Sequence, residues 1–238
     1  MTSLTDRYGH GITNCFHTVH VFDSPAFLAH AAARRIALLA QRAARTQPFL
    51  RIALAGGTTP QACYQALREE SLDWSRIHIY FGDERCLPAG NPQRNDEMAA
   101  QSLLDQVPIP ANQIHRIHAH WGAVPAALDY ADCLRQSGPL DLVILGMGED
   151  GHTASLFPGL ADPKEQRLVI PVLNAPKPPS ERVSLGPVAL LAARQLLFLV
   201  TGQGKHAALQ RLQQGAPLPP QQFRMAHWYV DRAAWHGV

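Results

Sequence analysis

The chain has 238 residues, 46% of them hydrophobic, and a formal net charge of +2. A chain of this size can bury a sizeable core without disulfide cross-links, which suits one large α/β domain over residues 1–238, or one domain with a small lobe. No block of lysine or arginine stands out, so we expect no nucleic-acid partner, whereas a small anionic ligand would need only a few placed cations. The opening stretch, MTSLTDRYGHG, lacks the apolar core of a signal peptide, and the apolar run at 188–200 is too short to span a membrane. We therefore expect a cytoplasmic protein without a membrane partner.

The cysteines and histidines form neither a disulfide framework nor a zinc motif. The four cysteines are scattered without a CxxC spacing, which is typical of reduced thiols in a cytosolic protein: Cys15, Cys63, Cys86 and Cys133. The most closely spaced group of histidines comprises His115, His118 and His120, on a predicted strand and the loop after it. Because no spacing of a closed zinc site accompanies them, we expect no metal there.

Strands and helices alternate along most of the chain. The pattern predicts strands at 16–22, 51–55, 77–81, 113–117, 142–145, 168–173, 181–185, 196–200 and 223–230. The longer helices predicted between these strands lie at 26–45, from 60 to about 70, at 93–104, at 125–136 and in a segment ending near 212. Two short helices are predicted as well, one at 153–156 and one from residue 187. This alternation predicts a doubly wound, mostly parallel sheet with helices on both faces.

The stretch Asp141–Gly159, DLVILGMGEDGHTASLFPG, carries the densest chemistry. Its apolar start, LVIL, predicts a strand buried on both faces, and glycines then allow a sharp turn that can approach a ligand closely. Glu149, Asp150 and His152 lie in and just after this turn. Because ligands of open α/β sheets bind beyond the carboxyl ends of the strands, these side chains are placed for chemistry.

Two further strand ends carry residues suited to a phosphate. The strand at 51–55 runs directly into GGTTP and a helix, where exposed backbone N–H groups favour an anion. The turn alone is compatible equally with a purely structural role. The strand at 77–81 ends in GDERCLP, where Arg85 could hold a phosphate through two hydrogen bonds. Lys205, in the turn TGQGK after the strand at 196–200, is a second candidate cation.

The segment 146–151, GMGEDG, also fits the dinucleotide-binding pattern GxGxxG. We reject this interpretation because its two acids would place negative charge beside the negatively charged pyrophosphate. The helix after it is also cut short by Pro158, and the next strand ends in Asn174 rather than in an acid that could bind a ribose.

Three stretches together resemble the signatures of the 6-phosphogluconolactonase family: AGGTTP at 55–60, FGDERCLP at 81–88 and LGMGEDGHTASLFPG at 145–159. ERVSL at 181–185 and TGQGK at 201–205 are also similar, so the resemblance extends over nearly the whole chain. It implies a fold akin to sugar-phosphate isomerases, no cofactor, and hydrolysis of 6-phospho-D-glucono-1,5-lactone to 6-phosphogluconate in the oxidative pentose phosphate route. The expected partner is thus a small sugar-phosphate lactone, bound by a monomer or weak dimer.

The resemblance also implies the site residues. His152 would be the catalytic group, supported by either Asp150 or Glu149. The implied substrate- and phosphate-binding residues are Gly56, Gly57, Thr58, Thr59, Asp83, Arg85, Asn95, Gly148, Gly151, Arg182 and Lys205. A lactone is an activated ester, so a histidine of near-neutral pKa can activate water against it without a metal or a covalent nucleophile.

Two other functions are compatible with such a fold. Glucosamine-6-phosphate deaminases have a related Gly-x-Asp-Gly-His turn followed by Asn-Glu-Pro, but this chain has Ser155-Leu156-Phe157-Pro158 instead. A non-catalytic sugar-phosphate sensor usually carries a DNA-binding domain, and no basic helix-turn-helix segment precedes the first predicted strand. Both observations favour the lactonase.

Overall fold

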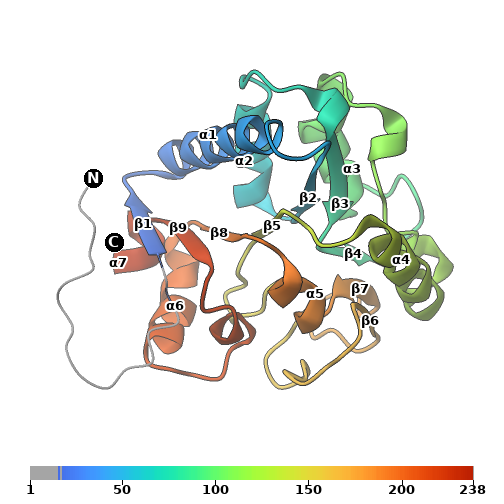
Figure 1. Ribbon diagram of the computed structural model, residues 1–238. Helices are drawn as coiled ribbons and strands as arrows, with labels where there is room; N and C mark the ends of the chain where they lie inside the picture. Colours follow the sequence, from blue (N-terminus) through green and yellow to red (C-terminus); the bar gives the residue numbers. More distant parts are fainter. Residues whose placement is uncertain (1–15, 17, 238) are drawn as a thin grey trace.

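The computed structural model describes residue 16 and residues 18–237, and its centre is a six-stranded sheet (Figure 1). Every strand pair in this sheet is parallel, which confirms the predicted fold class. The spatial order is β1 (Thr18–Phe22), β9 (His227–Asp231), β8 (Leu196–Val200), β5 (Leu142–Leu145), β2 (Leu50–Leu54) and β3 (Ile77–Phe81). Two predictions concern residues outside this described range: the lack of a signal-peptide core in MTSLTDRYGHG and the reduced thiol of Cys15.

Helices lie on both faces of this sheet. In Figure 1, α1 (Pro25–Ala43) and α2 (Thr58–Leu67) lie on one side, and α6 (His206–Gln213) and α7 (Arg232–His236) lie on the other. Ser24 begins α1 by accepting a hydrogen bond from the Phe27 backbone N–H at 3.3 Å. The remaining helices are α3 (Asn95–Ser102), α4 (Ala123–Ser137) and α5 (Pro187–Ala192). Within the described residues, none of the helices is long and apolar enough to cross a membrane.

A second, three-stranded sheet was not expected. It consists of β4 (Asp83–Arg85), β7 (Arg182–Leu185) and β6 (Val169–Val172), and both of its strand pairs are antiparallel. The sequence placed β6 and β7 correctly but assigned 83–85 to a turn. Gly82 joins the two sheets, because its carbonyl accepts from the Leu185 backbone N–H at 2.8 Å while its own N–H donates to Leu54 in β2. The residues that follow β3 are thus held by the second sheet.

Three further element predictions were wrong. The predicted strand at 113–117 is a short helical turn, Ala111–Gln113, followed by a single bridge between Ile79 and Ile114, because neighbouring hydrogen bonds do not continue the pairing. The predicted helix at 153–156 is a tight turn, since Ala154 adopts a φ of 47° and Thr153 bridges to Leu156. The last strand begins at His227 rather than at 223, because Pro219–Gln222 forms a helical turn before it.

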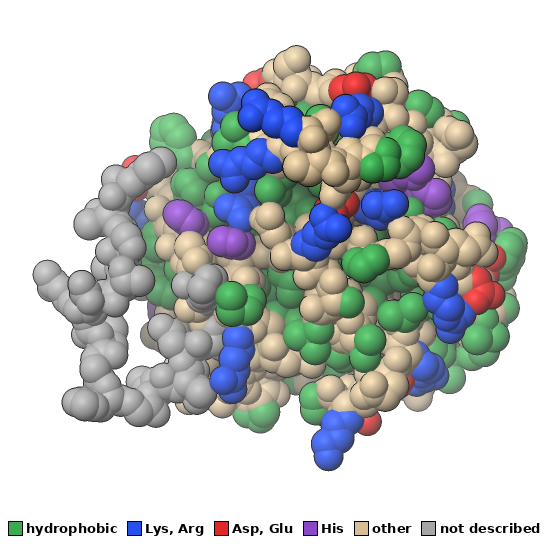
Figure 2. Space-filling view, viewed as in Figure 1, with side chains coloured by type: hydrophobic (Ala, Val, Ile, Leu, Met, Phe, Trp, Pro, Cys, Tyr) green, Lys and Arg blue, Asp and Glu red, His purple; other side chains and the backbone are tan. Residues whose placement is uncertain are grey.

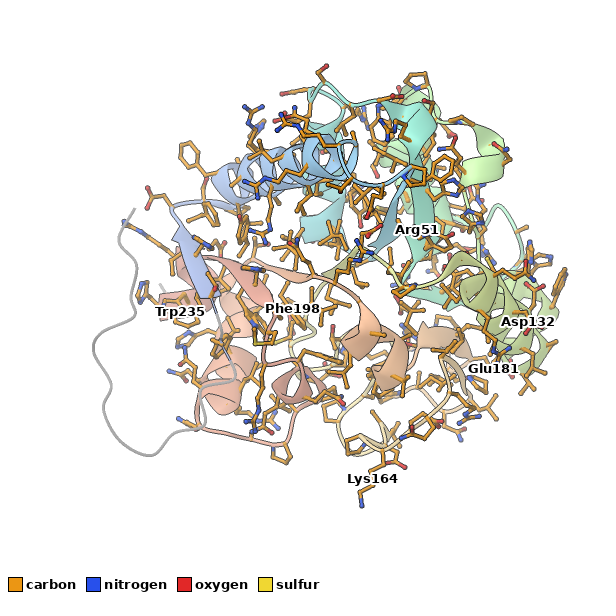
Figure 3. The ribbon with its side chains drawn as sticks, in the orientation of Figure 1. Arg51, Asp132, Lys164, Glu181, Phe198 and Trp235 are labelled. Carbon is orange, nitrogen blue, oxygen red and sulfur yellow. The ribbon has the colours of Figure 1, made fainter. Side chains whose placement is uncertain are left out.

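The central strands are buried, and their parallel pairing brings the turns that follow them to one edge of the sheet. All residues of β5 and β8 are buried, and the Phe198 and Trp228 rings stack with centroids 3.9 Å apart. Figure 3 shows Phe198 inside the protein between sheet and helices. Figure 2 shows lysines and arginines in separate groups on the face in view. Because the six strands are parallel, the turns after β2, β5 and β8 meet at the carboxyl edge of the sheet.

Candidate active site

The turn after β5 is closed by backbone hydrogen bonds. The Gly148 N–H donates to the His152 carbonyl at 2.8 Å, and the Gly151 N–H donates to the Gly148 carbonyl at 2.9 Å. Gly151 has a φ of 89°, a conformation that favours glycine. The Thr153 hydroxyl donates to the Gly146 carbonyl at 2.8 Å and fixes the end of the turn. These bonds bring the side chain of His152 back over residue 150.

His152 and Asp150 form a close pair. Their Nδ1 and Oδ1 atoms are 2.5 Å apart, and the side chains are 19% and 32% exposed, respectively. The carboxylate can only accept, so Nδ1 carries the hydrogen and Nε2 of a neutral imidazole keeps its lone pair. The Phe157 ring packs beside the imidazole with centroids 4.7 Å apart. The arrangement leaves Nε2 as the basic atom of the site.

The surroundings set the charge of both groups. Burial lowers the pKa of His152, and this outweighs the opposing effect of Asp150, while the positive charge of Lys177 lowers it further. Burial alone would raise the pKa of Asp150, but the hydrogen bond and charge of His152, aided by Lys177, bring it below its ordinary value. Near pH 7 the pair is therefore a neutral imidazole beside a carboxylate.

Glu149 points elsewhere. A Cβ built on Gly204 would lie 2.7 Å from Glu149 Oε1, so this exposed side chain lies against the turn after β8. The same construction at Gly148 would overlap His152 and Asp150, which places both of those side chains together over Gly148. Of the two acids that the sequence left open as partners of His152, the structure brings only Asp150 to the imidazole.

The start of α2 forms an open anion cradle. Gly57 precedes the helix with a φ of 104° and no side chain caps it, so the first N–H groups lack intrahelical acceptors. Thr58 is exposed beside them, and Thr59 Oγ1 lies 2.6 Å from Thr201 Oγ1 in the turn after β8. This contact joins the GGTTP turn to the segment that carries Lys205. In the described part of the chain, no carboxylate lies within ion-pair distance of the Lys205 ammonium.

Asp83 and Asn95 pack against the turn that precedes this cradle and hydrogen-bond to each other. Asp83 is buried and accepts from Ser155 Oγ at 2.6 Å and from Asn95 Nδ2 at 3.1 Å. The Asn95 carboxamide fills the space that a Cβ at Gly56 would need. The two side chains therefore join β4, the start of α3 and the turns after β2 and β5.

Glu84 is a buried residue that the sequence analysis treated only as part of a charged loop. Its carboxyl group accepts from the backbone N–H groups of Arg85, Asn95 and Asp96 at 2.7–2.8 Å, so it caps the N-terminus of α3. Burial, followed by the charge of Asp96, raises the pKa of Glu84 to about 8. Arg94, which precedes α3, pairs with Asp96 through two 2.8 Å bonds. The sequence carries no local signal for this cap, because Glu84 lies in β4, ten residues before Arg94, the residue that precedes α3.

The two arginines expected to bind phosphate face each other across the β4–β7 pair. Arg85 donates to the Gln93 carbonyl. Arg182 is buried, lies 5.5 Å from the Phe157 ring centroid, and donates to the carbonyls of residues 177–179 at 3.1–3.2 Å. Burial lowers the pKa of Arg182. Arg182 thus holds the proline-rich loop 174–180 against the site, and this loop brings in Lys177, which the sequence analysis did not single out.

The histidines at 115, 118 and 120 do not converge. His115 Nε2 lies 2.9 Å from His78 Nδ1, whereas His118 Nδ1 lies 3.0 Å from Asp129. His78 and His115 line a separate cavity of about 510 Å³ between β3 and α4, which none of the candidate site residues line. Across the described residues, no three His, Cys, Asp or Glu side chains are grouped to hold a metal ion.

Comparison with known proteins identifies the family. The model of the family described as glucosamine-6-phosphate isomerases/6-phosphogluconolactonase matches residues 23–235. The chain belongs to this family. The 6-phosphogluconolactonase of Mycobacterium leprae is 34% identical over 215 residues, covering 84% of this chain and 87% of that protein.

Family members with solved structures share the fold. The structure of 6-phosphogluconolactonase from Trypanosoma cruzi is 29% identical, with a TM-score of 0.85, covering 96% of this chain and 99% of that one. A monomeric glucosamine-6-phosphate deaminase is 20% identical, with a TM-score of 0.78, covering 91% of this chain and 98% of that one. That second similarity concerns the fold alone.

Proposed function

We propose that this protein is a 6-phosphogluconolactonase that hydrolyses 6-phospho-D-glucono-1,5-lactone to 6-phospho-D-gluconate, within the oxidative pentose phosphate route. The observation that carries the proposal is the His152–Asp150 pair, at 2.5 Å, on the same sheet edge as the open start of α2 and Lys205. The name of the Mycobacterium leprae relative supports the same activity. The cytoplasmic location and the monomer or weak dimer stay predictions from the sequence.

The proposed mechanism uses His152 as a general base. A water molecule attacks the lactone carbonyl carbon while His152 Nε2 takes one of its protons. Backbone N–H groups of the turn after β5, other than those of Gly148 and Gly151 that close the turn, stabilise the negative oxygen that results. When the ring C–O bond breaks, Nε2 returns its proton to the departing ring oxygen, which becomes a hydroxyl of the open-chain product. Asp150 orients the imidazole and stabilises its transient positive charge.

In the proposed binding mode, the phosphate lies at the start of α2. Backbone N–H groups of Gly57, Thr58 and Thr59 and the ammonium of Lys205 supply hydrogen bonds and positive charge. Arg85 and Arg182 contribute further positive charge from the second sheet. The ring carbonyl then faces His152.

A deaminase with this fold is the alternative. The deaminase family has an Asn-Glu-Pro segment where this chain has Ser155-Leu156-Phe157-Pro158. Here Phe157 packs between the His152 imidazole and the Arg182 guanidinium, with distances of 4.7 and 5.5 Å, and offers no acid–base group. This favours hydrolysis of a lactone over deamination.

The decisive assay generates the lactone in situ from glucose 6-phosphate with a dehydrogenase and NADP⁺. A second dehydrogenase that oxidises 6-phosphogluconate then reports product formation. We expect the protein to accelerate product formation above spontaneous hydrolysis, to do so after exhaustive chelation, and to act poorly on unphosphorylated gluconolactone. Release of ammonia from glucosamine 6-phosphate, without acceleration of lactone hydrolysis, would instead establish the deaminase.

A further inference from the structure

The loop 174–180 is fastened to the candidate site rather than lying free on the surface. The Ala175 N–H donates to the Ser180 carbonyl at 2.9 Å and closes the loop. Arg182 then binds the carbonyls of Lys177, Pro178 and Pro179 with Nε and Nη2. Because Arg182 is itself buried at 6% exposure, its bonds fix the backbone on the C-terminal side of the Lys177 side chain, and the Ala175–Ser180 bond holds the N-terminal side of the loop.

The side chain of Lys177 reaches the carboxylate that pairs with His152. Lys177 Nζ lies 3.4 Å from Asp150 Oδ2, whereas Asp150 Oδ1 accepts from His152. The two oxygens of Asp150 are therefore divided between one cation and one imidazole. Lys177 is 48% exposed, so its ammonium keeps part of its hydration. The contact lies on the Nδ1 side of the imidazole, away from the atom that would accept the proton from water.

The other charges around the imidazole come from several elements. Asp150 and Glu149 belong to the same turn, but Glu149 is directed to the turn after β8. Asp83 contributes a negative charge from β4, and Arg182 contributes a positive charge from β7 behind the Phe157 ring. In the described part of the chain, Lys177 and His152 are the basic groups within ion-pair distance of Asp150.

We propose that Lys177 is a positioning residue for the hydrolysis: its ammonium fixes the Asp150 carboxylate against His152 and opposes protonation of the imidazole. This inference rests on the proposed function. By holding Oδ2, Lys177 limits rotation of the carboxylate and so preserves the short bond at Oδ1. Its positive charge keeps His152 neutral at lower pH, where a base without such a neighbour would already be protonated. The same charge favours return of the proton to the departing oxygen.

Two substitutions at this position separate charge from chain length. Lys177→Met keeps an apolar side chain of similar length but removes the ammonium, whereas Lys177→Arg keeps the positive charge. Lys164→Met is the matched control, because Lys164 is exposed and extends away from the body of the protein (Figure 3). We expect all three variants to fold, since both lysines are surface side chains and the Arg182 bonds to the loop remain.

The first measurement is an NMR titration of the His152 ring, assigned by the signal missing from His152→Asn. In Lys177→Met we expect the titration midpoint to rise by about half a pH unit to one unit, whereas Lys177→Arg and Lys164→Met stay near the wild-type value. An unchanged midpoint in Lys177→Met would overturn the proposal. The titration midpoint does not depend on turnover. It therefore tests the effect of Lys177 on His152 even if the wild-type protein shows no lactonase activity and the proposed function is wrong.

The second measurement is the pH profile of kcat/KM for the lactone. The acidic limb of Lys177→Met should move upward with the NMR midpoint, giving a loss that approaches roughly three- to tenfold at pH values well below both midpoints and a much smaller change at pH 8. Lys177→Arg should restore the profile. If the methionine and arginine variants lose activity equally at all pH values and also lose thermal stability equally, Lys177 only maintains the loop and the proposal is wrong.

Discussion

Replacing His152 with asparagine separates its chemical role from its structural one. Asparagine keeps a polar group near Asp150 but cannot take a proton from water. Loss of a general base typically lowers turnover by ~10²–10⁴-fold, which corresponds to ~2.7–5.5 kcal/mol of activation free energy. We therefore expect kcat of His152→Asn to fall by that factor, close to the spontaneous rate.

The structural cost of the same change should be much smaller. The His152 side chain is 19% exposed and makes one bond to a partly exposed carboxylate, in addition to its contact with the Phe157 ring. Losing these contacts should cost about 1 kcal/mol, which lowers the thermal midpoint by about 2–4 °C in a chain of this size. Nearly all molecules would still be folded at 25 °C, because typical stabilities are about 5–15 kcal/mol.

The pH profile gives an independent check on the wild-type protein. Burial lowers the pKa of His152 below its ordinary value, so the imidazole is neutral and active at pH 7. We expect kcat/KM to be constant where the imidazole is neutral and to fall as it becomes protonated at lower pH, with a midpoint below the ordinary histidine value of about 6.5. Folding stability should also decrease as the pH falls through about 6.5, because the unfolded chain then binds the proton more readily than the native site.

The assay compares kcat with the thermal midpoint for both proteins, after subtraction of spontaneous lactone hydrolysis. Lactone generation must be faster than its consumption at every pH, so the coupling dehydrogenase is added in excess. A folded His152→Asn protein with near-normal kcat would refute the general-base role and direct attention to Asp150. A variant that is unfolded at 25 °C would contradict the small structural cost deduced from the exposure of the side chain.

Three other substitutions test different parts of the site. Lys205→Met should weaken 6-phosphogluconate binding about 10- to 150-fold in calorimetry, as expected for loss of a charged hydrogen bond, and unchanged affinity would remove Lys205 from the phosphate site. Ser155→Ala should lower the free energy of unfolding by about 1–3 kcal/mol in denaturant titration, because buried Asp83 loses a 2.6 Å donor, and an unchanged value would contradict the importance of this bond. Gly148→Ala should lower kcat about 100-fold because the added methyl group would displace His152 from its pairing position, and a crystal structure showing an undisturbed pair with normal activity would contradict this expectation.

The sequence determined the main sheet and the location of the candidate site. Short apolar runs such as LVIL followed by glycine predict buried strands, and their alternation with helices predicts parallel pairing. Parallel pairing then brings the turns at 56–59, 146–152 and 201–205 to one edge, without any knowledge of distances. Local patterns suffice here because each depends on residues that are neighbours in the chain.

Only the tertiary structure decided which charged groups meet. The sequence offered Asp150 and Glu149 equally to His152, and the backbone bonds of the glycine turn direct only the first toward it. Glu84 became a helix cap because the second sheet holds β4 beside α3. Lys177 reaches Asp150 across 27 positions in the chain because Arg182 binds the loop carbonyls. These contacts depend on the directions of side chains from separate elements, and no local period or motif specifies such directions.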